Sequence, residues 1–140
     1  MWMTKNVELF CWILLYNGCI IIYVLVKNSN CEVIKMCKEL CRTEMFDGVE
    51  NGMGKCVLEY WLISTKHMFE GKTISFLCYG VEVRLRNENS ESYDEIRSAE
   101  EVFASKEMAM EFLNKLADGL VTPCTLEDVI IDSLSIALSN

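Results

Sequence analysis

The stretch from Lys72 to Arg86 alternates in a way that defines a β-strand with two distinct faces. In its second half, apolar Val81, Val83 and Leu85 alternate with three charged residues, the period of two expected when one sheet face is buried and the other meets water. The first half is apolar at both parities, which predicts cover on both faces, and Gly80 between the halves is a candidate β-bulge. The chain must therefore build a sheet, and the remaining segments must cover it.

Composition limits the classes of partner. With 140 residues, 51% of them hydrophobic, the chain is long enough for one domain with an ordinary core. Its net charge is -8 and its isoelectric point is about 4.7, and the 13 basic residues are scattered along the chain. Because affinity for phosphate comes chiefly from clustered Lys and Arg, nucleic acid is excluded as an expected partner.

Cysteine usage points to a reducing compartment. There are eight cysteines, and Cys11, Cys19 and Cys78 fall inside apolar runs. A secreted disulfide framework is usually a short chain rich in loops, so most of these thiols are interpreted as small buried hydrophobic side chains. Structural disulfides remain the alternative.

Residues 9–26 form an uncharged apolar run interrupted only by Asn17 and Gly18, with Lys5 and Lys27 on either side. As a helix the run would span about 27 Å, close to the roughly 30 Å of a bilayer core, so it predicts a single transmembrane helix. The expected organisation is a hydrophobic N-terminal segment, residues 1–30, followed by a domain of residues 31–140. We expect a single-pass membrane protein whose C-terminal domain faces the cytoplasm.

Other interpretations of this run remain open. A cleaved signal peptide lacks an Ala-x-Ala-like site, and the residues around Cys19 are only loosely similar to a lipoprotein cleavage site. The pair Asn17-Gly18 between two β-branched runs is a strong β-hairpin signal, although both strands would be apolar on both faces. If translation begins at Met36 or Met45, the run is not made and the protein is soluble and cytoplasmic.

The middle of the chain contains further strand and turn signals. Residues 31–42 have an apolar stripe at helical spacing, and a strand running into Phe46 fits almost as well. Glycine-rich turns follow, and the next segments are a strand at Lys55–Thr65, a turn at residues 66–71, the strand at residues 73–86, a polar loop at residues 87–94 and short extended pieces near residues 95–97 and 101–104.

Two helices are predicted at the C-terminus. Ser105 is a good N-cap for a helix with an apolar stripe that ends at Gly119, which is suited to a left-handed C-cap. Thr125 with Asp128 resembles a capping box for a last helix over residues 126–138, whose apolar stripe includes Val129, Ile130, Leu134 and Ala137. The sequence predicts an α+β fold in which a small antiparallel sheet of about three to four strands is covered on one face by both C-terminal helices.

Three short motifs resemble a known family. They are Tyr79-Gly80-Val81-Glu82-Val83, then Phe112-Leu113-x-x-Leu116, then the segment from Leu120 to Ile130 with Thr122-Pro123 and Asp128-Val129. Together they look like a family of short proteins of unknown function from clostridial and related Firmicutes, over about residues 36–138. The resemblance implies a domain of unknown function and carries no catalytic or binding residue.

Candidate chemistry is sparse. The best available metal-ligand set is Cys31, Cys37, Cys41 and His67, of which only the Cys37-x3-Cys41 spacing suits a zinc knuckle. His67 is the sole histidine and lies in a charged stretch read as a solvent-facing turn, and no nucleophile motif or phosphate-binding loop accompanies it. We therefore assign no catalytic, cofactor-binding or metal residues and expect no cofactor.

The two C-terminal helices also invite a helix-turn-helix interpretation, but the second contains Glu127, Asp128 and Asp132 and no basic residue, so phosphates would repel it. The acidic loop reads as a solvated face because it lacks a calcium-binding pattern. The leading hypothesis is a non-catalytic regulatory or protein-interaction module, attached to a membrane through residues 9–26, with a protein partner or a second copy as its ligand. The alternative is a cysteine-based metal-binding or redox-responsive protein.

Overall fold

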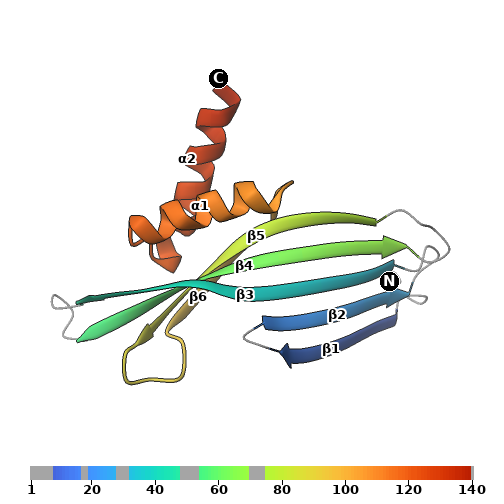
Figure 1. Ribbon diagram of the computed structural model, residues 1–140, viewed down its shortest axis with the longest axis horizontal. Helices are drawn as coiled ribbons and strands as arrows, with labels where there is room; N and C mark the ends of the chain where they lie inside the picture. The colour runs from blue at the N-terminus through green and yellow to red at the C-terminus, as the bar shows by residue number, and fades with distance from the viewer. Residues whose placement is uncertain (1–7, 17–18, 28–31, 48–53, 70–74, 140) are drawn as a thin grey trace, which may run out of the picture.

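The computed structural model describes residues 8–16, 19–27, 32–47, 54–69 and 75–139 (Figure 1). They form one antiparallel sheet and a C-terminal helical segment. The elements are β1 (Glu8–Tyr16), β2 (Cys19–Lys27), β3 (Glu32–Asp47), β4 (Lys55–Phe69), β5 (Ser75–Asn87), β6 (Glu95–Phe103), α1 (Lys106–Asp118), the 3-10 turn η2 (Pro123–Thr125) and α2 (Leu126–Ser139).

The sheet is a meander in which each strand pairs with its neighbour in the sequence, in the order β1-β2-β3-β4-β5-β6. All pairs are antiparallel. The prediction of an α+β fold, with an antiparallel sheet of about three to four strands and two C-terminal helices, is confirmed in part: β3 to β6, α1 and α2 fit it, and β1 and β2 extend the sheet to six strands.

The N-terminal segment differs from the helix predicted over residues 9–26. The structure has β1 and β2 there, paired in register from Glu8 opposite Lys27 to Tyr16 opposite Cys19, and β2 continues the sheet by pairing with β3. Asn17 and Gly18 lie outside the described residues. β-branched side chains make up much of β2, and such residues favour strands when a neighbouring strand is present to pair with them. Among the described residues, no helix has the length and apolar character needed to cross a membrane.

Residues 32–42 are also part of a strand and not of the helix that the spacing of residues 31–42 favoured. β3 pairs with β4 along its whole length, and the register shifts between Leu40 and Arg42. The bulge at Cys41 reverses the alternation of side chains: Leu40 lies opposite Trp61, whereas Arg42 lies opposite Tyr60. This reversal breaks the period of two and makes the sequence resemble a helix.

One face of the sheet packs against α1. Leu58, Tyr60 and Leu62 of β4 share this face with Val81 and Val83 of β5, because Tyr60 pairs with Val83 and Leu62 with Val81. The same buried cluster includes Ala109, Phe112, Leu113, Leu116 and Ala117 of α1 and Leu126 at the start of α2. Burial of this apolar surface supplies the main driving force for the fold.

Strand β5 reverses the predicted burial of its two halves. Phe76 and Leu77 in the first half are 46% and 47% exposed, whereas charged Glu82 and Arg84 in the second half are only 2% and 8% exposed. The register between β5 and β6 shifts between Tyr79 and Val81, but β4 pairs with β5 through Gly80 without a shift, so Gly80 is not itself the bulged residue that was predicted. Ala99 and Phe103 pair on either side of this point, so β6 carries the extra residues.

Helix α1 begins where the sequence predicted, since the Ser105 side chain accepts a hydrogen bond of 3.2 Å from the Met108 amide. It ends differently in detail: Gly119 has a φ of -91°, and the left-handed residue is Leu120, with a φ of 51°. The Gly119 amide donates to the Lys115 carbonyl, which satisfies one of the carbonyls at the helix end.

Only α1 lies across the sheet. Helix α2 rises away from it, with the C-terminus at its far tip (Figure 1), and it contacts β6 and η2. The prediction that both helices cover one sheet face is therefore wrong for α2. Val129 and Ile130 are half-buried, but Leu134, which was expected to be buried, is exposed. Ala137 lies where the structure does not describe side chains.

Candidate functional site

The sheet face opposite α1 contains a cluster of buried charged side chains. Glu59 and Trp61 of β4 and Glu82, Arg84 and Arg86 of β5 point to this face, because they alternate with the core residues of the same strands. Glu59 is 6% exposed and Glu82 is 2% exposed. Buried carboxylates require charged or hydrogen-bonding partners.

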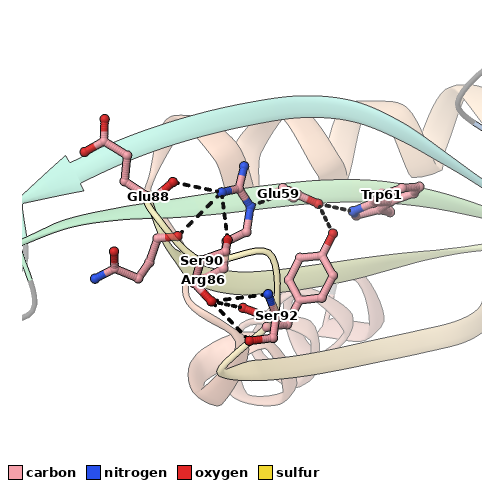
Figure 2. A network of polar contacts seen from close by, with 8 residues as sticks. Glu59, Trp61, Arg86, Glu88, Ser90 and Ser92 are labelled. Atoms are coloured by element: carbon pink, nitrogen blue, oxygen red, sulfur yellow. Dashed lines mark hydrogen bonds and ion pairs between the residues drawn. The ribbon is translucent and has the colours of Figure 1, made fainter.

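Glu59 accepts hydrogen bonds from three donors, as Figure 2 shows. They are the indole nitrogen of Trp61 at 3.0 Å, the Nε of Arg86 at 3.0 Å and the hydroxyl of Tyr93 at 2.8 Å. Burial by itself raises the pKa of Glu59, but the bonds from Arg86, Tyr93 and Trp61 outweigh burial and lower the pKa. Glu59 is therefore ionised at neutral pH.

Arg86 links this carboxylate to the polar loop that joins β5 and β6. A second guanidinium nitrogen of Arg86 lies 3.4 Å from the Ser90 carbonyl and 3.5 Å from the carbonyls of Asn87 and Glu88 (Figure 2). Tyr93, at the other end of the loop, reaches the same carboxylate. Glu59 thus holds the loop against the sheet from both of its ends.

A second carboxylate, Glu82, forms ion pairs with two cations. One of its oxygens lies 2.9 Å from the Nζ of Lys38, and the other lies 2.6 Å from the Nε of Arg84. The Arg84 guanidinium also lies over the Trp61 ring, 4.1 Å from its centroid. Burial lowers the pKa of Arg84, but contacts with Tyr93 and Glu82 outweigh it, and the net pKa is raised.

This arrangement is suited to structural support. Each carboxylate is matched by at least one guanidinium, and the contacts tie β3, β4, β5 and the polar loop together. Fully satisfied buried networks of this kind favour one arrangement of the strands.

His67 has a different position from the predicted solvent-facing turn. β4 extends past Thr65 to Phe69, so His67 lies within a strand, opposite Phe76 of β5. The two rings stack with centroids 4.5 Å apart, and the His67 Nε2 contacts the carboxylate of Glu101. Glu101 belongs to the β6 bulge and has a φ of 55°, an uncommon backbone conformation for a residue other than glycine.

The structure does not bring the candidate metal ligands together. Cys37 lies opposite Ser64 and His67 opposite Ile34, so alternation places Cys37 and His67 on opposite faces of the sheet. Cys41 points toward α1, where its sulfur is 3.8 Å from that of Met110. Cys31 lies outside the described residues. Within the described ranges, no three His, Cys, Asp or Glu side chains form a metal-binding group.

A groove with a volume of about 530 Å³ lies between β6 and α2. We call it the β6–α2 groove. Arg97 and Ala99 of β6 point toward the helical side of the sheet, because they pair with core residues Val83 and Val81. The remaining walls include Pro123 of η2 and the α2 residues Leu126, Ile130 and Ile131.

The β6–α2 groove combines apolar side chains with a strand edge. β6 is the last strand of the sheet and pairs with β5 on one side only. Ile131 is 52% exposed, and Leu134, one turn further along α2, is 44% exposed. A strand edge beside an exposed apolar helix face is a surface typical of protein–protein contacts.

Comparison with known proteins places the chain in a family. The sequence profile of a family of unknown function, DUF6514, matches residues 38–135, which extend from β3 into α2. The chain belongs to the DUF6514 family. No curated protein and no solved structure matches it.

The DUF6514 region includes both the charged cluster and the β6–α2 groove, whereas β1 and β2 precede it. Sequence reasoning missed both features. In the sequence, the charged residues of the cluster alternate as they would on an exposed strand face. Tyr93, which completes the cluster, is an isolated aromatic residue in a polar loop. The groove had one usable signal: Val129, Ile130 and Ile131 are consecutive, and three consecutive apolar residues spread over more of a helix than one packed face can cover.

Proposed function

We propose that this DUF6514 protein is a non-catalytic protein-interaction module that binds a segment of a partner protein in the β6–α2 groove. The observation that carries the proposal is the placement of exposed Ile131 and Leu134 on a helix that projects beside an edge strand. Exposing such side chains to water costs free energy, and a partner that covers them recovers it.

The charged cluster supports this role indirectly. Lys38, Glu82 and Arg84 connect β3 to β5 by ion pairs, and Glu59 fixes the loop that leads into β6. Binding surfaces carried by rigid elements lose less conformational entropy on association than mobile ones. The cluster thus holds the strand that forms one wall of the groove.

The test is selection of a random peptide library displayed on phage against the immobilised full-length protein. We expect enrichment of peptides that bind with Kd values in the micromolar range, as is common for peptide-recognition modules. Ile131→Asp, which places a charge in the groove at an exposed position, is expected to weaken binding at least about tenfold. Met108→Asp is the matched control, because Met108 is an equally exposed apolar residue of α1 outside the groove.

Two results would contradict the proposal. One is a failure to enrich any peptide over an uncoated surface. The other is enrichment of peptides that bind the Ile131→Asp variant as tightly as the unchanged protein.

Attachment to a membrane through residues 9–26 stays a prediction. Its support is the uncharged apolar character of the run. Cell fractionation of the full-length chain tests it: we expect recovery with membranes and release by detergent, whereas recovery in the soluble fraction without detergent would refute it.

A further inference from the structure

We infer that the occupant of the β6–α2 groove is an extended peptide segment of a partner, apolar and basic in alternation, which adds as a strand to the edge of β6. This inference rests on the proposed function and specifies its partner. It depends on the shape of the edge, the apolar wall and the charge around them.

The edge is regular where the groove lies. From Glu95 to Ala99, β6 pairs with β5 residue by residue, from Leu85 to Val81. Groove residues Arg97, Ser98 and Ala99 belong to this stretch. An incoming strand extends such a ladder by main-chain hydrogen bonds, and every second side chain of that strand then points toward the helix side.

Beyond Ala99, the bulge limits how far an added strand can run. Residues 100–102 face Gly80 alone on β5, and Glu101 leaves the extended conformation. Bulges and charged residues are the devices by which natural sheets prevent pairing at their edges. β6 therefore has a protected half and an open half, and the open half is the one beside α2.

The apolar wall matches the alternation of an added strand. Ala99 is a small side chain on the helix side of β6, which leaves room between the strand and α2. Ile130 and Ile131 line the opposite wall of the groove. Side chains of Val or Ile at alternate positions of the incoming strand would fill this space.

The charge around the groove indicates which residues lie between the apolar positions of the partner segment. Acidic residues dominate around the groove: Glu127 lines it, Asp128 follows on α2, and Glu95 and Glu100 flank the open edge of β6. The one basic residue of the lining, Arg97, is 3.5 Å from Glu95. A partner with Lys or Arg between its apolar positions complements this surface. A second copy of the chain that added its own β6 would bring one Arg against three Glu and does not complement it.

Three synthetic peptides of about ten residues test the inference against the full-length protein. The first alternates Lys with Val or Ile; the second has the same composition in a helical period; the third replaces each Lys of the first by Glu. By fluorescence anisotropy, we expect the first to bind at least about tenfold more tightly than either of the others. N-methylation of every second amide, made in both registers, is expected to abolish binding in the register that blocks the bonds to β6.

Charge reversal locates the contact. Glu127→Lys is expected to weaken the basic alternating peptide several-fold and to strengthen the acidic one, and both effects should diminish with added salt. Glu111→Lys is the control, because Glu111 is an exposed acidic residue of α1 outside the groove lining.

The outcomes separate this inference from the proposed function. Tightest binding by the helical-period peptide, or equal binding by the N-methylated peptides, would refute strand addition while leaving a peptide-binding groove. A dimer of the protein that Ile131→Asp dissociates would assign the groove to a second copy and refute the partner peptide. If none of the three peptides binds and library selection enriches no peptide, both the proposed function and this inference are refuted.

Discussion

Replacing Glu59 is expected to destabilise this fold more than replacing any exposed carboxylate. In Glu59→Ala, three donors lose their acceptor: the indole of Trp61, the guanidinium of Arg86 and the hydroxyl of Tyr93. Trp61 is 7% exposed, so water cannot readily replace its partner, and an unsatisfied buried donor costs about 1–3 kcal/mol.

The second contribution is the unpaired charge of Arg86. Removing one partner of a fully buried ion pair costs about 3–5 kcal/mol. The Arg86 side chain is 26% exposed and keeps its contacts with loop carbonyls, so the cost here lies at or below the lower end of that range. We expect a total loss of about 3 kcal/mol, a large part of the roughly 5–15 kcal/mol that stabilises a typical domain.

Urea unfolding at neutral pH, followed by far-ultraviolet circular dichroism, measures this loss as a decrease in the midpoint with an unchanged slope. Glu111→Ala is the control, because Glu111 is 72% exposed and pairs at 3.7 Å with the equally exposed Lys115, one turn further along α1. We expect a change below about 0.5 kcal/mol. The reasoning is refuted if Glu59→Ala and Glu111→Ala lose the same stability.

The remaining predictions concern pH, packing and one buried hydroxyl. Hydrogen bonds lower the pKa of Glu59 below its ordinary value of 4.5, so its stabilising contribution is complete above that value and is lost as pH falls through the folded pKa. The loss of unfolding free energy in Glu59→Gln, measured in urea, should therefore become smaller toward about pH 2. A loss that does not change with pH would contradict this. Gly80→Ala places a Cβ 2.1 Å from the Ala99 carbonyl oxygen and should lower the free energy of unfolding by about 3 kcal/mol or more. Gly54→Ala should lower it by about 1 kcal/mol, because φ is 71° there but no atom lies within 4 Å. Equal urea midpoints for the two variants would refute the close approach at Gly80. Tyr60→Phe removes a 2.9 Å hydrogen bond to the Val121 carbonyl and should cost about 1 kcal/mol. Burial, followed by the charge of Glu44, raises the pKa of Tyr60 to about 12, so the tyrosine ionisation near pH 12 in an ultraviolet titration should be missing from this variant.

The periodicity of β5 predicted its geometry correctly and its environment incorrectly. Alternation placed Val81 and Val83 on one face and Glu82 and Arg84 on the other, as the structure has them. It could not show that the charged face is buried, because the partners that make burial tolerable come from elsewhere in the chain. Lys38 is 44 residues from Glu82, and no local pattern reports such a contact.

The predicted helices were accurate at their start and inaccurate in their packing. Ser105 marks the start of α1 because capping is a local interaction, whereas the direction of α2 depends on how η2 turns the chain after Leu120. The same limit applies to residues 9–26. Hydropathy reports that these side chains are apolar, but it does not distinguish a helix in a bilayer from strands that extend a sheet. The pairing of β2 with β3 is a long-range property that hydropathy does not contain.

The β6 bulge adjoins the β6–α2 groove at Ala99. Gly80 permits the main chain of β6 to approach β5 closely at Ala99, and the extra residues that follow turn Glu101 toward His67. This displacement ends the regular edge and leads the chain through Ser105 into α1, across the helical face of the sheet. Helix α1 then returns the chain, through η2, to the side of β6 that precedes the bulge, where α2 begins. A glycine at position 80 thus permits the close approach of β5 and β6 at the bulge that ends their regular pairing.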